Sequence, residues 1–275
     1  MLSLNKYVAF AAKSFSMPDI CLRLRKLIDD PRSNAADIAR LICIDPSLTA
    51  KVLRLANSSL FRFPSEVESI EKAVNIIGGE ALYNLVVAET TNSAFSCFNS
   101  ELVALDEHWY KSVYCGMVAK SLARHLQLRG SGRFFVMGIL LNLSELVVAK
   151  CSPQEYLVYR DKESSMPTHE RQREHFGFTF SYCSGTILSN WKLPLVIYYP
   201  VMNVDDKKKQ LIDVDVGLLA LASRITELRH DKKYNNEIEL FCKEIPNSVN
   251  ADMDAIANAI TFAEKETAKV SQLIH

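Results

Sequence analysis

The sequence predicts an all-α fold, a multi-helical bundle of two packed subdomains. Apolar residues recur three and four positions apart along most of the chain, as in Val214, Leu218, Leu221 and Ile225. Helix-start signals precede many of these segments, whereas runs typical of β-strands are few. The short apolar run 196–199 has no alternation of its own, and we interpret it as helix.

The first hundred residues carry signals for five or six short helices. Asp45-Pro46 offers a side-chain acceptor at a helix start and a proline in the first turn, where a missing N–H costs nothing. Ser33-Asn34 precedes another helix in the same way. Gly78-Gly79 ends one helix and opens the next. The connections are therefore short throughout this part.

Beyond Asn99-Ser100 the expected helices become longer, covering residues 102–127 and 134–150. This change predicts a boundary, with an N-terminal helical subdomain at residues 1–100 and a second helical subdomain at residues 101–275. No flexible linker separates the two parts, so we expect them to pack together.

Composition excludes several classes of protein. Hydrophobic residues make up 48% of the chain and charged residues 23%, which is globular usage rather than that of a disordered or fibrous protein. Lys and Arg total 32, as do Asp and Glu, so no overall field attracts nucleic acid or an anionic membrane. The apolar region 138–149 is interrupted by Asn142, Ser144 and Glu145 before it reaches the roughly 20 residues of a membrane span. Neither a membrane nor nucleic acid is an expected partner.

The cysteines indicate a reducing compartment. They are odd in number and occur singly, without a Cys-x-x-Cys pair. Apolar neighbours, as around Cys43, favour buried thiols over metal ligands or redox centres. The start of the chain, residues 1–15, is interrupted by Lys6 and Lys13, and fits an amphipathic helix better than a signal peptide. We therefore expect a cytoplasmic protein.

No self-contained catalytic motif is present. Gly130-Ser131-Gly132 lacks the rest of any phosphate-binding loop. His169 and His175 stand six apart, so on a helix they point to different faces and cannot grip one ion. We predict no catalytic residue, no metal ligand and no cofactor.

The N-terminal half nevertheless resembles a known family, the HDOD domains, which are output domains related to the HD metal-dependent phosphohydrolases. The stretch from Ile44 to Ser58, with Asp45-Pro46 at one end and Asn57-Ser58 at the other, is its most specific part. Weaker matches follow in the family's order along most of the chain. They are Met17-Pro18, Ser69-Ile70, Ala73-Val74, Ile77-Gly78, Trp109, Ser112, Gly138-Ile139-Leu140 and Trp191-Lys192-Leu193-Pro194.

The resemblance implies that the second subdomain is HD-like but lacks the metal ligands. HD phosphohydrolases hold metal ions with histidines and aspartates from several helices. Alignment on the flanking matches puts Lys111, Leu141, Asn142 and Phe180 at such positions, and a further pair near Val204-Asp205. A lysine repels a cation, and leucine and phenylalanine have no lone pair to donate. We expect Leu140, Leu141 and Leu143 to fill the space as core.

Residues shared with the family have structural explanations. We expect structural roles for Asp45, Pro46, Asn57, Ser58, Trp191 and Pro194. Phe61, Arg62 and Phe63 are candidate contacts for a partner, because aromatic and arginine side chains dominate binding hot spots. Burial would explain the two phenylalanines equally well.

For function, the resemblance implies a non-catalytic regulatory module of bacterial signal transduction that binds a protein partner. One alternative is a metal-dependent phosphohydrolase acting on a nucleotide or cyclic dinucleotide, with a site that the alignment misses. Another is a sensor that binds a nucleotide ligand without turnover. The partner, the pathway and the oligomeric state are left open.

Overall fold

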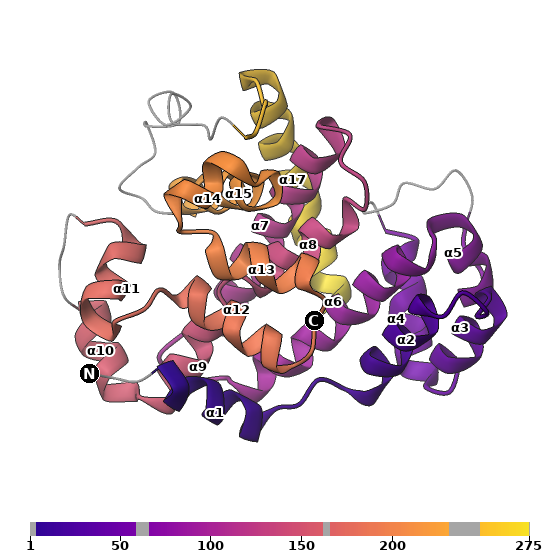
Figure 1. Ribbon diagram of the computed structural model, residues 1–275, viewed down its shortest axis with the longest axis horizontal. Coiled ribbons are helices and arrows are strands. Elements are labelled where there is room, and N and C mark those ends of the chain that lie inside the picture. Colours follow the sequence, from indigo (N-terminus) through magenta and orange to yellow (C-terminus); the bar gives the residue numbers. More distant parts are fainter. Residues whose placement is uncertain (1–3, 59–65, 162–165, 231–247, 275) are drawn as a thin grey trace.

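The computed structural model describes residues 4–58, 66–161, 166–230 and 248–274. In these ranges the regular secondary structure is helical and no strand occurs (Figure 1). The predicted all-α fold is confirmed.

Of the N-terminal helices, the second to fifth lie together at one end of the molecule, the first runs along its lower edge, and the longer sixth extends from that end toward the centre (Figure 1). They are α1 (Leu4–Ser14), α2 (Asp19–Asp29), α3 (Ala35–Ile42), α4 (Pro46–Ala56), α5 (Ile70–Ile77) and α6 (Gly79–Cys97).

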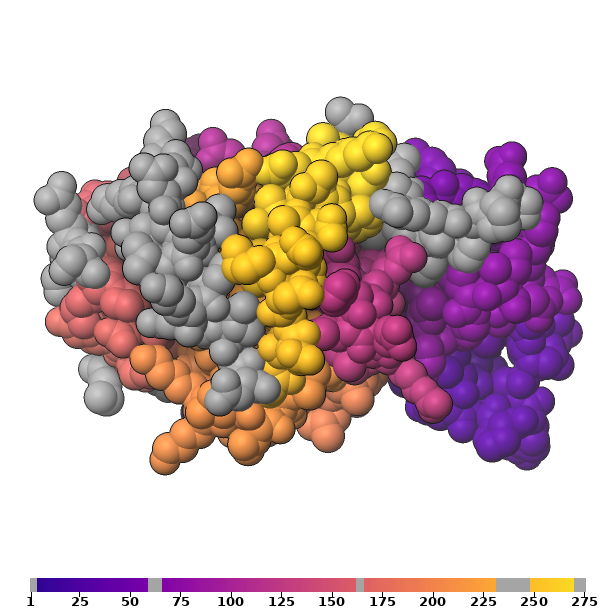
Figure 2. All heavy atoms as spheres, turned by 90° about the horizontal axis from the view of Figure 1, so that it is seen from above, coloured from indigo at the N-terminus to yellow at the C-terminus, as the bar shows by residue number. Residues whose placement is uncertain are grey.

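The remaining helices form the centre and the other end of the molecule. They are α7 (Leu105–His125), α8 (Gly132–Leu140), α9 (Leu143–Cys151), α10 (Pro153–Asp161), α11 (Thr168–Phe176), α12 (Phe180–Asn190), α13 (Leu195–Asn203), α14 (Lys207–Ile212), α15 (Val214–His230) and α17 (Met253–Ile274). In Figure 2, α17 crosses the upper face of the molecule beside α7.

The expected helix starts are present. The Asp45 carboxylate accepts a hydrogen bond from the Leu48 amide at 3.0 Å, with Pro46 in the first turn of α4. Asn34 forms a reciprocal capping box with Asp37 at the start of α3. Gly78 has a φ of 82° between α5 and α6, which only glycine adopts easily. These local signals fix the boundaries as the sequence indicated.

One expected helix is broken. Residues 134–150 form two helices, α8 and α9, rather than one. At the start of α9 the Ser144 amide donates to the Ser184 hydroxyl of α12 at 2.9 Å, and the Ser144 hydroxyl donates to the Phe180 carbonyl at 2.6 Å. These bonds to a neighbouring helix stabilise the break at residues 141–142.

The stretch 132–151 has the length and apolar character of a membrane-crossing helix, with a mean hydropathy of 1.8. Within the protein, however, 78% of that window is buried. The break between α8 and α9 falls in its middle. Core packing accounts for the apolar character of this stretch.

The two ends of the chain contribute to one hydrophobic core. Helix α1 packs against α9 and α12, and Tyr7 lies with its ring 5.5 Å from that of Phe178. Helix α17 packs against α7 and also against α4. The division at residue 100 stays a prediction, since α1 belongs in space with helices of the second part.

A very close helix contact joins α7 to α8. A Cβ atom on Gly138 would lie under 3.0 Å from the Cα and N atoms of Gly116. A Cβ atom on Gly116 would lie 2.5 Å from the carbonyl oxygen of Phe135. The two backbones therefore meet directly, and no larger residue fits either position.

We expect Gly138→Ala to lower the free energy of unfolding by about 2–3 kcal/mol, because the added methyl group forces the helices apart. Urea denaturation measures the loss. Gly132→Ala in the same helix is the matched control, since its Cβ would sit 3.5 Å from the nearest side-chain atom. We expect that change to be neutral or stabilising by up to about 1 kcal/mol. Equal effects of the two substitutions would refute the role given to the contact.

Candidate functional site

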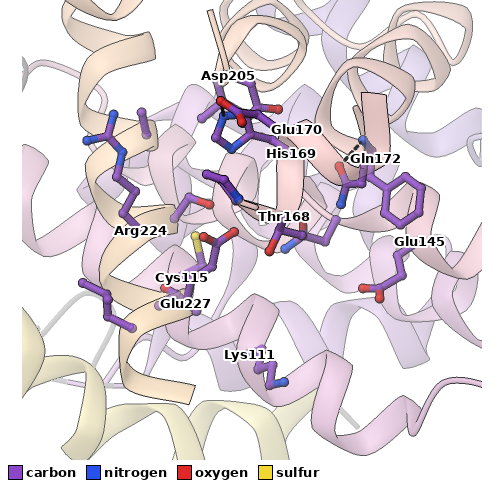
Figure 3. A pocket seen from close by; sticks show the side chains of 18 of the residues that line it. Lys111, Cys115, Glu145, Thr168, His169, Glu170, Gln172, Asp205, Arg224 and Glu227 are labelled. Atoms are coloured by element: carbon purple, nitrogen blue, oxygen red, sulfur yellow. Dashed lines mark hydrogen bonds and ion pairs between the residues drawn. The ribbon is translucent and has the colours of Figure 1, made fainter. Parts of the chain in front are cut away.

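A cavity of about 710 Å³ lies between α7, α9, α11 and α15. This size is in the range of small-molecule binding sites. Figure 3 shows Lys111 entering from α7, Glu145 from α9 and Arg224 from α15 on the opposite wall. His169, Glu170 and Asp205 gather at the upper side of this view.

Three of the four positions at which the alignment expects degenerate ligands lie on this cavity. Lys111, Asn142 and Phe180 all line it, and so does Asp205. The fourth, Leu141, is 1% exposed and belongs to the core. The alignment therefore points to one place in space.

The expectation that leucines close this space is wrong in part. Leu140, Leu141 and Leu143 are buried core residues, as expected. The cavity remains beside them, because Asn142 in the turn between α8 and α9 lines it and the leucines pack elsewhere. A hollow persists beside three of the four aligned positions.

The lining carries both signs of charge. Carboxylates come from Glu145, Glu170, Asp205 and Glu227, and cationic groups from Lys111, Lys207 and Arg224. Opposite charges this close to one another lower the net field, so the cavity is not a simple anion site.

Glu145 is the most firmly held of these groups. The Tyr156 hydroxyl donates to its Oε1 at 2.8 Å, and His108 Nδ1 lies 3.3 Å from its Oε2. Burial alone would raise the pKa of this carboxyl, but the hydrogen bonds from His108 and Tyr156 and the charge of Lys111 lower it overall. Its side chain is still 31% exposed, which leaves it accessible from the cavity.

The opposite wall is braced by polar contacts. The Arg224 guanidinium donates to the Gln210 side-chain oxygen at 2.7 Å, and Gln210 donates to the Val204 carbonyl at 2.6 Å. Asp205 accepts a hydrogen bond from the Ser181 hydroxyl. These bonds tie α15 to α14 and to the end of α13.

His230 and Cys115 complete that wall. Burial, together with the charges of Lys111 and Arg229, lowers the pKa of His230, which packs 5.0 Å from the ring of Tyr114. Burial raises the pKa of Cys115 to about 12, so this thiol stays protonated and unreactive. The interpretation of the cysteines as small core residues fits this position, but it is wrong for Cys43, which is exposed.

These residues do not fit the metal pair of an HD phosphohydrolase. Among the described residues, no group of three or more His, Cys, Asp or Glu side chains could hold a metal ion. An ammonium, a neutral amide and a phenyl ring stand at the aligned positions Lys111, Asn142 and Phe180. No step through a metal can be derived for this cavity.

The two histidines of α11 separate as expected. His169 lines the cavity, whereas His175 lies 3.4 Å from Glu155 and packs on Phe176 at 4.7 Å. Two residues six positions apart on this helix therefore face different parts of the protein.

The motif residues lie away from the cavity. Asn57 joins the end of α4 to Val67: its side-chain amide donates to the Val67 carbonyl at 2.9 Å, and its side-chain oxygen accepts from the Val67 amide at 2.7 Å. The Ser58 hydroxyl donates to the Leu55 carbonyl at 2.6 Å. The expected contact of Phe61, Arg62 and Phe63 lies outside the described residues.

The contacts of Trp191 and Pro194 also fit structural roles. Trp191 is 5% exposed and packs 5.0 Å from the ring of Phe15. Pro194 precedes α13, and its carbonyl accepts from the Ile197 amide at 2.9 Å. Neither residue lines the cavity.

Sequence reasoning missed Glu145, Arg224, Glu227 and His230 as cavity residues. The signal for Glu145 was its place shortly after Asn142, where a charged residue interrupts an apolar helix. No motif marks the three residues of α15, and only the fold brings them to the site.

The described residues form an all-α fold of the HD-like class. A family model for the HDOD domain matches residues 15–206. The chain belongs to the HDOD domain family, as the motif residues indicated.

Solved structures show the same fold. An HDOD domain protein of unknown function from Geobacter sulfurreducens superposes with a TM-score of 0.69 at 18% identity, covering 99% of this chain and 98% of that one. A protein from Shewanella amazonensis SB2B named "Putative phosphohydrolase" gives a TM-score of 0.75 at 19% identity, covering 98% of each chain.

A relative from Treponema pallidum (strain Nichols), an uncharacterized protein, is 24% identical over 190 residues. The match covers 68% of this chain and 36% of that protein. The chain thus spans about a third of the length of this relative.

We expect Asn57→Ala to destabilise the protein by about 1–2 kcal/mol, because it removes the two hydrogen bonds that join the end of α4 to Val67. Chemical denaturation measures the change. Asn190→Ala is the control, since the Asn190 side chain makes one bond within its own helix. A loss no larger than that of the control would contradict this role of the two bonds.

The lowered pKa of Glu145 predicts the pH dependence of its contribution. An ionised carboxyl favoured by folding stabilises above its unfolded pKa, and the contribution disappears as pH falls through the lower, folded pKa. The stability difference between wild type and Glu145→Gln should therefore be larger at about pH 7 than at about pH 4. Urea titrations at both pH values test this. A difference that grows on acidification would show that the carboxyl is not held ionised.

Proposed function

We propose that this chain is a non-catalytic HDOD-type module of signal transduction, acting in the bacterial cytoplasm by binding a protein partner. One observation carries the proposal. Where an HD phosphohydrolase needs metal ligands, the cavity presents Lys111, Asn142 and Phe180. An ammonium facing this space opposes a divalent cation by direct charge repulsion.

The family and one neighbour support a regulatory role. A protein from Marinobacter aquaeolei VT8 named "Putative signal transduction protein" shares the fold, with a TM-score of 0.61 at 18% identity. This chain covers 58% of that protein, which is therefore longer. A module that acts through a partner has no need of its own metal centre.

The cavity favours a second candidate function. A hollow of about 710 Å³ with polar groups converging on it is able to hold a small molecule. In this version the protein senses a ligand without turnover, and a nucleotide is the ligand that the family's catalytic relatives suggest. Ligand binding would then bias the contact with the partner.

Capture from a lysate of the native host tests partner binding. We expect the wild-type chain to retain a specific protein, and the double variant Phe61→Ser with Phe63→Ser to retain less of it, because aromatic anchors dominate interfaces. The matched control is Tyr182→Ser, which removes an aromatic side chain that is 44% exposed on α12. Equal capture by the double variant would remove these residues from the interface.

Elemental analysis of the same preparation separates adaptor from enzyme. We expect less than stoichiometric transition metal and no phosphatase or phosphodiesterase activity. Stoichiometric metal accompanied by hydrolysis of a nucleotide or cyclic dinucleotide would overturn the proposal.

A further inference from the structure

We propose that the cavity binds a small zwitterion, an amino acid or amino-acid derivative whose cationic group contacts Glu145 and whose carboxylate contacts Lys111. This inference rests on the second candidate function, in which the cavity holds a small molecule. It replaces the nucleotide by a ligand class that the charges of this chain favour.

Glu145 is built to receive a cationic donor. Each of its oxygens takes one contact from the protein, from Tyr156 at 2.8 Å and from His108 at 3.3 Å. A carboxylate oxygen has two acceptor sites, so each one keeps a site for a further donor. The two protein contacts fix the carboxylate in place before a ligand arrives, which reduces the entropic cost of binding.

His108 and Tyr156 act as positioning residues for this carboxylate. His108 is 7% exposed and Tyr156 is 4% exposed, so both donors approach from the protein interior. The face of Glu145 that remains accessible is the one that lines the cavity (Figure 3).

Lys111, which lines the same cavity as Glu145, supplies the opposite charge. It follows His108 by three residues on α7, about one helical turn. A pure cation would gain from Glu145 and be repelled by Lys111, and a pure anion would meet the reverse. A ligand with both charges gains from both groups.

The rest of the lining disfavours a polyanion. Glu170, Asp205 and Glu227 add three carboxylates to that of Glu145, against the further cations Lys207 and Arg224. A nucleotide would bring two or more negative charges into a site where carboxylates outnumber the fixed cations. A zwitterion leaves the balance of the site unchanged.

The test uses the full chain and L-arginine as the probe, an amino acid that carries a carboxylate and two cationic groups, and measures binding by calorimetry and thermal shift. We expect saturable binding to the wild type. Glu145→Gln and Lys111→Gln should each weaken it roughly tenfold, about 1.4 kcal/mol. Glu155→Gln is the matched control, because Glu155 pairs with His175 outside the cavity, and it should change nothing.

A second probe checks the sign of each contact. Agmatine, which lacks the carboxylate of arginine, should bind more weakly than arginine, and Lys111→Gln should strengthen its binding by removing repulsion. His108→Gln, which alters the support of Glu145, should weaken arginine without changing the dependence on Lys111.

Each contrary outcome has a distinct meaning. Absence of arginine binding at about 10 mM to a folded wild-type chain overturns the zwitterion, as does binding that neither Glu145→Gln nor Lys111→Gln alters. Saturable binding of GMP, weakened by Lys111→Gln and not by Glu145→Gln, overturns it too but leaves a nucleotide sensor standing. Capture of a protein partner in either case leaves the adaptor function intact.

Discussion

The contact between Gly116 of α7 and Gly138 of α8 determines where the rest of the site can lie. It brings two backbones together without intervening side chains, so the relative position of the helices has little freedom. His108 and Lys111 precede Gly116 on α7, and Asn142 and Glu145 follow Gly138 across the turn. The floor of the cavity is therefore assembled by two segments that diverge from one fixed point.

Much of this architecture follows from local sequence. Helical periodicity predicts the all-α fold, and Asp45-Pro46 predicts the start of α4 from chemistry confined to four residues. The break between α8 and α9 could not be predicted, because it depends on Ser184, which lies 40 residues from Ser144 in sequence. Three of the aligned positions line the cavity, so the order of the family's motifs along the chain was enough to locate it. Its depth depends on tertiary packing, and leucine volumes alone suggested a filled core.

The polar group at the cavity floor is not explained by stability alone. A carboxylate beside an apolar core costs desolvation, and apolar residues of similar volume often stabilise a core as well or better. Here Glu145 is supported by His108 and Tyr156, and the Nε2 atom of His108 has no hydrogen-bond partner among the described residues. That unsatisfied atom adds a further cost. A carboxylate that is held toward a cavity at a cost in folding free energy is typical of a binding site.

The two walls of the cavity differ in how much of each lies within the range that the family model matches. Lys111, Asn142, Glu145 and Phe180 lie within residues 15–206, which the HDOD model matches. Arg224, Glu227 and His230 lie beyond that range, on α15. The neighbouring Arg229 pairs with Glu264 of α17, and α17 in turn packs against α4, the helix of the Asp45 to Asn57 motif. One wall therefore belongs to the shared domain, while the other combines Cys115 and Asp205 of that domain with a segment whose charges are not fixed by the family match. Ligand preference in this cavity depends on both walls, because four of the seven charged Asp, Glu, Lys and Arg side chains that line it lie within the matched range and three lie beyond it.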